Sequence, residues 1–174
     1  IFYRPKDIVS GDIYWFSTVG DYVIAAVVDC AGHGVPGAIL SMIANDLLTQ
    51  IVNDKKITTA GKALEELDRR LIEILHHEGS EVDMKEGMDI AFCALRSAGK
   101  GNSRVFTELQ FAGAKRPLLF FGNGDITVYN GNKFSIGGSH VGAKCFTNHN
   151  IKLNAGDAFY FYSDGFGDQF GGSH

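Results

Sequence analysis

Three aspartates lie where strand-forming residues meet a turn, and each adjoins or nearly adjoins a glycine: Asp12, Asp29 and Asp164. An ionised carboxylate at the mouth of a buried strand is costly unless a positive charge lies opposite it. Carboxylate and backbone oxygens suit hard divalent ions such as Mg²⁺ or Mn²⁺, which keep several water ligands. Either Asp29 meets a basic side chain, or these aspartates hold a metal ion.

A single aspartate beside a glycine most often forms a turn, because its side chain bonds to the nearby backbone and glycine accepts a positive φ. The three aspartates alone therefore leave turn formation and metal binding as equal alternatives. The pattern argues against zinc, because no cluster of histidine and cysteine supplies tetrahedral ligands.

The N-terminal elements should place two of these aspartates together. Residues 13–17 and 22–29 are rich in strand formers, and Val19-Gly20-Asp21 between them predicts a turn. Antiparallel strands place the start of one beside the end of the other. We therefore expect a hairpin that brings Asp12 near Asp29.

Two amphipathic helices follow the motif Asp29 to Met42. The first is expected from Pro36, where proline is tolerated in a first turn, to about Asn53. The second is expected after Thr58 or Thr59, with an apolar stripe that reaches Leu75. Because both helices have one polar side, we expect them to cover a sheet.

The second half of the chain predicts strands separated by tight turns. We expect them at residues 89–96, 104–112, 118–121, 126–129, 146–153 and 158–162. Two strands, two helices and then a meander of strands predict an α+β fold of antiparallel sheets covered by helices.

Composition limits the class of protein. The 174 residues are 45% apolar and 21% charged with a net charge of −4, which predicts a single domain and argues against nucleic acid as a partner. The three cysteines are widely spaced in apolar surroundings, so we expect reduced thiols and a cytoplasmic protein. Charged and helix-breaking residues interrupt the apolar stretches, so we expect no membrane segment in this piece. The start at Ile1 suggests that the chain is excised from a larger protein.

Several motifs, in this order and spacing, resemble the metal-dependent protein phosphatases of the protein phosphatase 2C (PP2C) family. More narrowly, they resemble the bacterial stage II sporulation protein E-like branch. They are Ser10-Gly11-Asp12, Asp29-Cys-Ala-Gly-His-Gly-Val-Pro-Gly-Ala, Phe111-Ala-Gly-Ala-Lys-Arg-Pro-Leu-Leu, Asn154-Ala-Gly-Asp and Ser163-Asp164-Gly165. The resemblance runs through essentially all 174 residues.

The resemblance implies a sandwich of two antiparallel sheets flanked by helices (αββα) and two Mg²⁺ or Mn²⁺ ions that activate a water. It implies that Asp29 bridges the ions, that Asp12 and Asp164 each hold one, and that the backbone carbonyl of Cys30 is a further ligand. It also implies hydrolysis of phosphoserine or phosphothreonine on a regulatory protein, such as an anti-sigma factor antagonist. An upstream sensor domain and a homodimer belong to the same expectation.

Some positions depart from the branch or keep two interpretations. Position 115 is Lys where the branch commonly has His, and a further acidic ligand is expected beyond the end of this chain. Asp89 matches an aspartate often seen in the branch, but it could simply start a strand. His33 could act as a general acid or could shape its glycine-rich loop.

A rival interpretation is a catalytically weak phosphatase fold that serves as a signalling or binding module. Replacement of any of the three aspartates would have favoured it, and all three are present.

Overall fold

The computed structural model describes residues 1–3, 8–32, 34–75, 87–99, 105–138 and 142–166. A five-stranded antiparallel sheet has the order β1-β2-β3-β4-β7, with bounds Asp12–Val19, Tyr22–Cys30, Met88–Ala98, Val105–Ala114 and His149–Lys152. A three-stranded antiparallel sheet has the order β6-β5-β8, with bounds Asp125–Tyr129, Leu118–Gly122 and Ala158–Phe161. The helices are α1 (Val35–Thr49), the π-helical turn η1 (Gln50–Asp54), α2 (Ala60–Leu75) and the 3₁₀ turn η3 (Asp164–Phe166).

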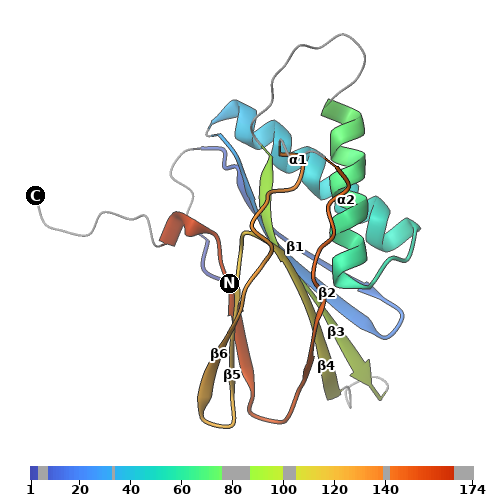
Figure 1. Ribbon diagram of the computed structural model, residues 1–174, viewed down its shortest axis with the longest axis vertical. Coiled ribbons are helices and arrows are strands. Elements are labelled where there is room, and N and C mark those ends of the chain that lie inside the picture. Colours follow the sequence, from blue (N-terminus) through green and yellow to red (C-terminus); the bar gives the residue numbers. More distant parts are fainter. Residues whose placement is uncertain (4–7, 33, 76–86, 100–104, 139–141, 167–174) are drawn as a thin grey trace, which may run out of the picture.

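The molecule has three layers. Figure 1 shows α1 and α2 on one side of the five-stranded sheet and the β5–β6 hairpin on the other. One hydrophobic core fills the space between the helices and the five-stranded sheet, and a second lies between the two sheets. Because side chains alternate along a strand, β3 and β4 each contribute residues from one face to the first core and from the other face to the second. The expected α+β fold with two antiparallel sheets is confirmed.

Connections after β4 differ from a simple meander. Residues 146–153 and 158–162 were expected as consecutive strands around a turn, yet β7 pairs with β4 while β8 pairs with β5. The turn at residues 154–157 therefore carries the chain from one sheet to the other. The reason is burial, because Ile151 packs between the sheets from one side and Phe159 from the other.

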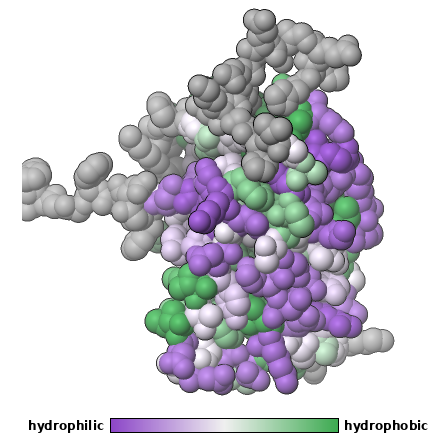
Figure 2. All heavy atoms as spheres, in the orientation of Figure 1, coloured by the Kyte–Doolittle hydropathy of each residue, from purple (hydrophilic) through white to green (hydrophobic). Residues whose placement is uncertain are grey.

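The first helix is apolar enough that length and composition alone would allow residues 35–54 to cross a membrane. A core helix passes the same test, and here Leu40, Ala44 and Leu48 are buried in the core beneath the helices. Core packing therefore accounts for the composition, and the expectation of no membrane segment stays a prediction. The surface in Figure 2 is mostly hydrophilic, with separate hydrophobic patches, one of them toward β6, where Ile126 and Val128 are exposed.

Candidate metal centre

Three aspartates stand side by side on adjacent strands. Asp12 on β1 pairs with Asp29 on β2, and Asp29 pairs with Asp89 on β3. Their strand neighbours belong to the core beneath the helices: Ile13, Val28 and Ile90. Since neighbours along a strand face opposite ways, all three carboxylates face the layer of the second sheet. The predicted proximity of Asp12 and Asp29 is confirmed by this register.

Such a row is unfavourable without a cation, because like charges directly opposite each other on neighbouring strands repel. The link between β4 and β5 supplies one. The Nη2 of Arg116 lies 2.6 Å from Asp29 Oδ2 and 3.4 Å from Asp89 Oδ2. The same nitrogen lies 2.6 Å from Oδ2 of Asp164, which begins η3 just after β8. One guanidinium therefore gathers carboxylates from both sheets.

Hydroxyl groups orient two of the aspartates. The Ser163 hydroxyl donates to Asp12 Oδ2 at 2.7 Å, which ties the segment after β8 to the start of β1. The Ser135 hydroxyl donates to Asp89 Oδ1 at 2.6 Å, and the ammonium of Lys115 lies 3.6 Å from the same oxygen. Asp164 is thus held by Arg116 and by its neighbour's contact with Asp12, although half of its side chain is exposed.

The charges shift the acidity of two carboxyl groups. Burial and then the Asp12 charge raise the pKa of Asp29 to about 7, although Arg116 opposes them. Burial also raises the pKa of Asp164, but the hydrogen bond and the charge of Arg116, with smaller hydrogen-bond contributions, together outweigh it, so that pKa falls below its usual value. The raised pKa of Asp29 therefore reflects its burial first and the neighbouring Asp12 charge second.

The loop after β2 packs tightly against the turn before β1. A Cβ on Gly11 would lie 2.8 Å from the Cys30 carbonyl oxygen, and one on Gly37 would lie 2.5 Å from the Gly32 carbonyl oxygen. Both glycines are thus needed for close backbone approach. Burial, followed by the charges of Asp29 and Asp12, raises the pKa of the Cys30 thiol to about 12. The Cys30 side chain is buried in the core beneath the helices, on the face of β2 opposite the Asp29 carboxylate, so its thiol does not point toward the aspartates.

The donor set fits a hard divalent ion, because it consists of carboxylate oxygens with one nearby backbone carbonyl. The cation held among Asp29, Asp89 and Asp164 here is a guanidinium nitrogen. Within the described ranges, no three acidic, histidine or cysteine side chains have the spacing of a finished metal site. The types of ligand atom present therefore suit a divalent metal ion. In this structure, however, the Arg116 guanidinium lies among the carboxylates that would hold it.

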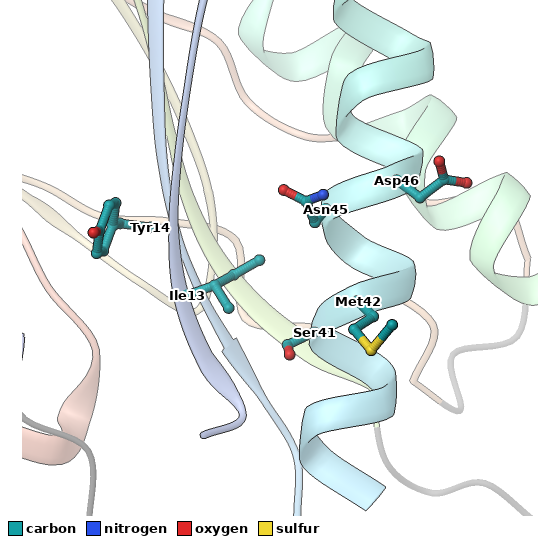
Figure 3. Close-up of a pocket in the computed structure, with 6 residues that line it drawn as sticks. All are labelled: Ile13, Tyr14, Ser41, Met42, Asn45 and Asp46. Atoms are coloured by element: carbon teal, nitrogen blue, oxygen red, sulfur yellow. The ribbon is translucent and has the colours of Figure 1, made fainter. Parts of the chain in front are cut away.

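A groove of about 440 Å³ lies between β1 and α1. In Figure 3, Ile13 points toward the helix and Tyr14 points to the opposite side of the strand. The Ser41 hydroxyl is already used, because it donates to the Ala38 carbonyl at 2.8 Å. None of the clustered aspartates lines this groove, which therefore does not compete as the site of chemistry.

The structure brings together Asp12, Asp29 and Asp164, and it adds Asp89, which could have been only the first residue of a strand. The alternative in which Asp29 meets a basic side chain is the one observed, with Arg116 as the partner. Neither Arg116 nor Ser135 was given a role from the sequence, although Arg116 lies within the family-like segment that begins at Phe111. His33 lies outside the described residues.

Comparisons with known proteins agree with the geometry. The family model for stage II sporulation protein E (SpoIIE) matches residues 20–173. Among solved structures, the SiaA-PP2C domain of Pseudomonas aeruginosa is 29% identical with a TM-score of 0.77, and the match covers 99% of this chain and 63% of that chain. The RsbU and RsbW domains of Rv1364c from Mycobacterium tuberculosis give 24% identity, a TM-score of 0.68 and coverage of 93% and 41%.

The structure of the PP2C phosphatase domain and a fragment of the regulatory domain of SpoIIE from Bacillus subtilis gives 20% identity and a TM-score of 0.65. That match covers 91% of this chain and 42% of that chain. A comparison with curated protein sequences gave no match. The fold is that of PP2C-type phosphatase domains, which are phosphoprotein phosphatases. The chain belongs to the stage II sporulation protein E family.

Proposed function

We propose that this domain is a metal-dependent serine/threonine protein phosphatase. The observation that carries the proposal is the convergence of four carboxylates from both sheets at one end of the sandwich: Asp12, Asp29, Asp89 and Asp164. That much negative charge calls for a multivalent cation. The family fold and the magnesium complex of the structurally similar RsbX support this assignment.

Asp29 is proposed to bridge two Mg²⁺ or Mn²⁺ ions, with Asp12 and the Cys30 carbonyl on one side and Asp164 on the other. When bound, such ions lower the pKa of a ligated water and clamp the oxygens of a phosphoryl group. The protein's own contribution is orientation. Ser163 fixes the Asp12 carboxylate, and the β1–β2 pairing fixes its distance from Asp29.

Lys115 is proposed to contribute to the binding of the phosphate group. Its side chain is half exposed beside Asp89, at the junction of β4 with the link that carries Arg116. A phosphate monoester is a dianion near neutral pH, and an accessible ammonium group attracts it. Lys115 thus adds positive charge beside the aspartates without pairing with a carboxylate that is proposed to hold a metal ion.

The proposed substrate is a phosphoserine or phosphothreonine on a regulatory protein, such as an anti-sigma factor antagonist. Support comes from structures of relatives, one that joins RsbU and RsbW domains and one that includes a fragment of a regulatory domain. The chain spans 63% of the length of the SiaA-PP2C domain chain. An attached sensor or regulatory domain and a homodimer belong to the same proposal, and the SpoIIE structure that includes a fragment of a regulatory domain supports the first of these. The three free cysteines support a cytoplasmic location.

A second candidate is a catalytically weak domain that serves as a signalling module. The Arg116 contact favours it, because a guanidinium that satisfies the aspartates makes a metal ion less necessary.

One experiment separates the two candidates. Phosphate release from an aryl phosphate and from a phosphoserine peptide is measured with Mn²⁺, with Mg²⁺ and with excess EDTA. The phosphatase proposal expects release with either ion and loss of release in EDTA. Release that persists undiminished in EDTA would contradict the metal mechanism, and no release with either ion would favour the signalling module.

A further inference from the structure

Arg116 contacts the aspartates in an unusual way. Arginine commonly pairs with one carboxylate through two parallel hydrogen bonds. Here a single nitrogen, Nη2, is shared by Asp29, Asp89 and Asp164 at 2.6, 3.4 and 2.6 Å. The Nε of Arg116 is buried without an acceptor among the described residues. The guanidinium thus acts as a point-like cation among several carboxylates, at the cost of an unsatisfied donor.

The backbone beneath Arg116 is fixed. A Cβ on Gly113 would lie 2.2 Å from the Arg116 carbonyl oxygen, and one on Gly131 would lie 2.7 Å from it. Lys115 has a φ of 56°, and its N–H donates to the Asn132 carbonyl at 2.7 Å. A left-handed conformation in a non-glycine residue persists only where the surroundings impose it. The fold therefore holds the Arg116 backbone in a fixed position, from which its side chain reaches the aspartates.

The contacts of Arg116 conflict with metal binding. Asp29 Oδ2 and Asp164 Oδ2 accept from the guanidinium at hydrogen-bond distance, and these are two of the carboxylates assigned to the metal ions. A divalent ion and a guanidinium at the same oxygens would repel each other strongly, because like charges a few ångströms apart interact by several kcal/mol at an effective dielectric of about 20. Both cations cannot occupy the cluster in this arrangement.

We propose that Arg116 is a resident cation that holds the aspartates together in the metal-free protein and leaves them when a divalent ion binds. This inference rests on the proposed metal site. Arg116 is then a positioning residue, which keeps Asp164 of one sheet beside Asp29 of the other until the ion arrives. The flexible side chain moves while the anchored backbone stays in place.

The test compares Mn²⁺ binding to chelator-washed wild-type protein, R116Q and R116K by titration calorimetry. R116Q removes the competing charge, and we expect it to bind Mn²⁺ on the order of tenfold more tightly, the size of one charge-assisted hydrogen bond. We expect R116K to lie between the two, because its ammonium keeps the charge without the planar geometry. The matched control is R96Q, an exposed residue near the other end of β3, and its affinity should equal that of the wild type.

A metal-free R116Q should also melt at a lower temperature than R96Q, and Mn²⁺ should remove the difference. If Arg116 only stabilised the fold, R116Q would instead bind Mn²⁺ less tightly than the wild type, because a loosened aspartate cluster binds metal less well. Unchanged or weaker Mn²⁺ binding by folded R116Q would therefore overturn the inference. Wild-type protein that binds neither Mn²⁺ nor Mg²⁺ would overturn the proposed function together with it.

A measurement on wild-type protein covers the case in which R116Q does not fold. The ¹H–¹⁵N signal of the Arg116 Nε, assigned by its loss in R116K, is followed during titration with Mg²⁺. If the Arg116 guanidinium leaves the aspartates, this signal should shift in parallel with Mg²⁺ binding. A signal that stays in place while Mg²⁺ binds would contradict the exchange.

Discussion

Asp29 accepts a hydrogen bond at 2.6 Å from Arg116, which lies 87 positions further along the chain. The two residues belong to different parts of the fold, because Asp29 lies one residue before the end of β2 and Arg116 lies in the link that leaves the five-stranded sheet. Their contact closes one end of the sandwich and places positive charge where the register of β1, β2 and β3 has aligned three carboxylates. Strand pairing thus determines where the aspartates lie, and a single arginine places a compensating positive charge among them.

The first prediction concerns the side chain of Cys30. C30A should leave Mn²⁺ affinity unchanged, because the thiol is buried with its pKa raised to about 12 and only the backbone carbonyl is assigned to a metal. The substitution should lower the free energy of unfolding by about 1 kcal/mol through lost packing. Calorimetric titration and denaturant unfolding measure the two effects. Loss of metal binding in a folded C30A would show that the sulfur is a ligand.

The second prediction concerns the close approach at Gly11. In G11A the new Cβ would stand 2.8 Å from the Cys30 carbonyl oxygen and 3.2 Å from that of Gly32. The loop after β2 must then shift, which should lower the free energy of unfolding by about 1–3 kcal/mol and weaken Mn²⁺ binding.

A suitable control is G138A, since the nearest atom to its Cβ would be the Ser135 Cβ at an ordinary 3.5 Å. Equal metal affinity in both variants would argue that the loop geometry at Gly11 does not contribute to the site.

The third prediction concerns a buried ion pair behind the site. The ammonium of Lys144 donates to Asp68 Oδ1 of α2 at 2.7 Å and to the Ser135 carbonyl at 2.8 Å, and both side chains are almost fully buried. K144M should cost about 3–5 kcal/mol, because it leaves the buried Asp68 carboxylate without its cationic partner, although the Gly137 N–H still donates to Oδ1 at 2.7 Å.

The double variant D68L/K144M should recover much of that loss, since neither charge is then left uncompensated. Denaturant unfolding of the two single variants and the double variant gives the coupling energy. Additive losses would indicate that the two side chains do not stabilise each other.

Local patterns were enough to predict the first hairpin and the position of Asp12 relative to Asp29. Alternation of apolar residues and the turn at residues 19–21 determine that pairing, and both are visible within one short segment. The two amphipathic helices were predicted for the same reason, although the π-helical turn at residues 50–54 gave no signal. The family resemblance added the expectation that Asp164 joins the cluster.

Long-range contacts could not be predicted in this way. The partners Asp29 and Arg116 are 87 residues apart, and their meeting depends on how the chain passes from one sheet to the other. The same limit applies to Ser135, whose hydroxyl reaches Asp89 across 46 residues. The separation of β7 and β8 into different sheets depends on which face of each strand is buried, and both strands have only four residues.

The central claim is that the aligned aspartates bind the metal ions that drive phosphate release. The most direct measurement is the initial rate of phosphate release from a phosphoserine peptide at saturating Mn²⁺ by wild-type protein, D29N and D21N. Asp21 lies in the turn at the opposite end of the same hairpin, so D21N makes the same chemical change away from the cluster and should keep the wild-type rate. D29N should lose at least about a hundredfold in rate, since even residues that only support metal ligands cost 10–100-fold. A folded D29N that releases phosphate as fast as D21N would contradict the account.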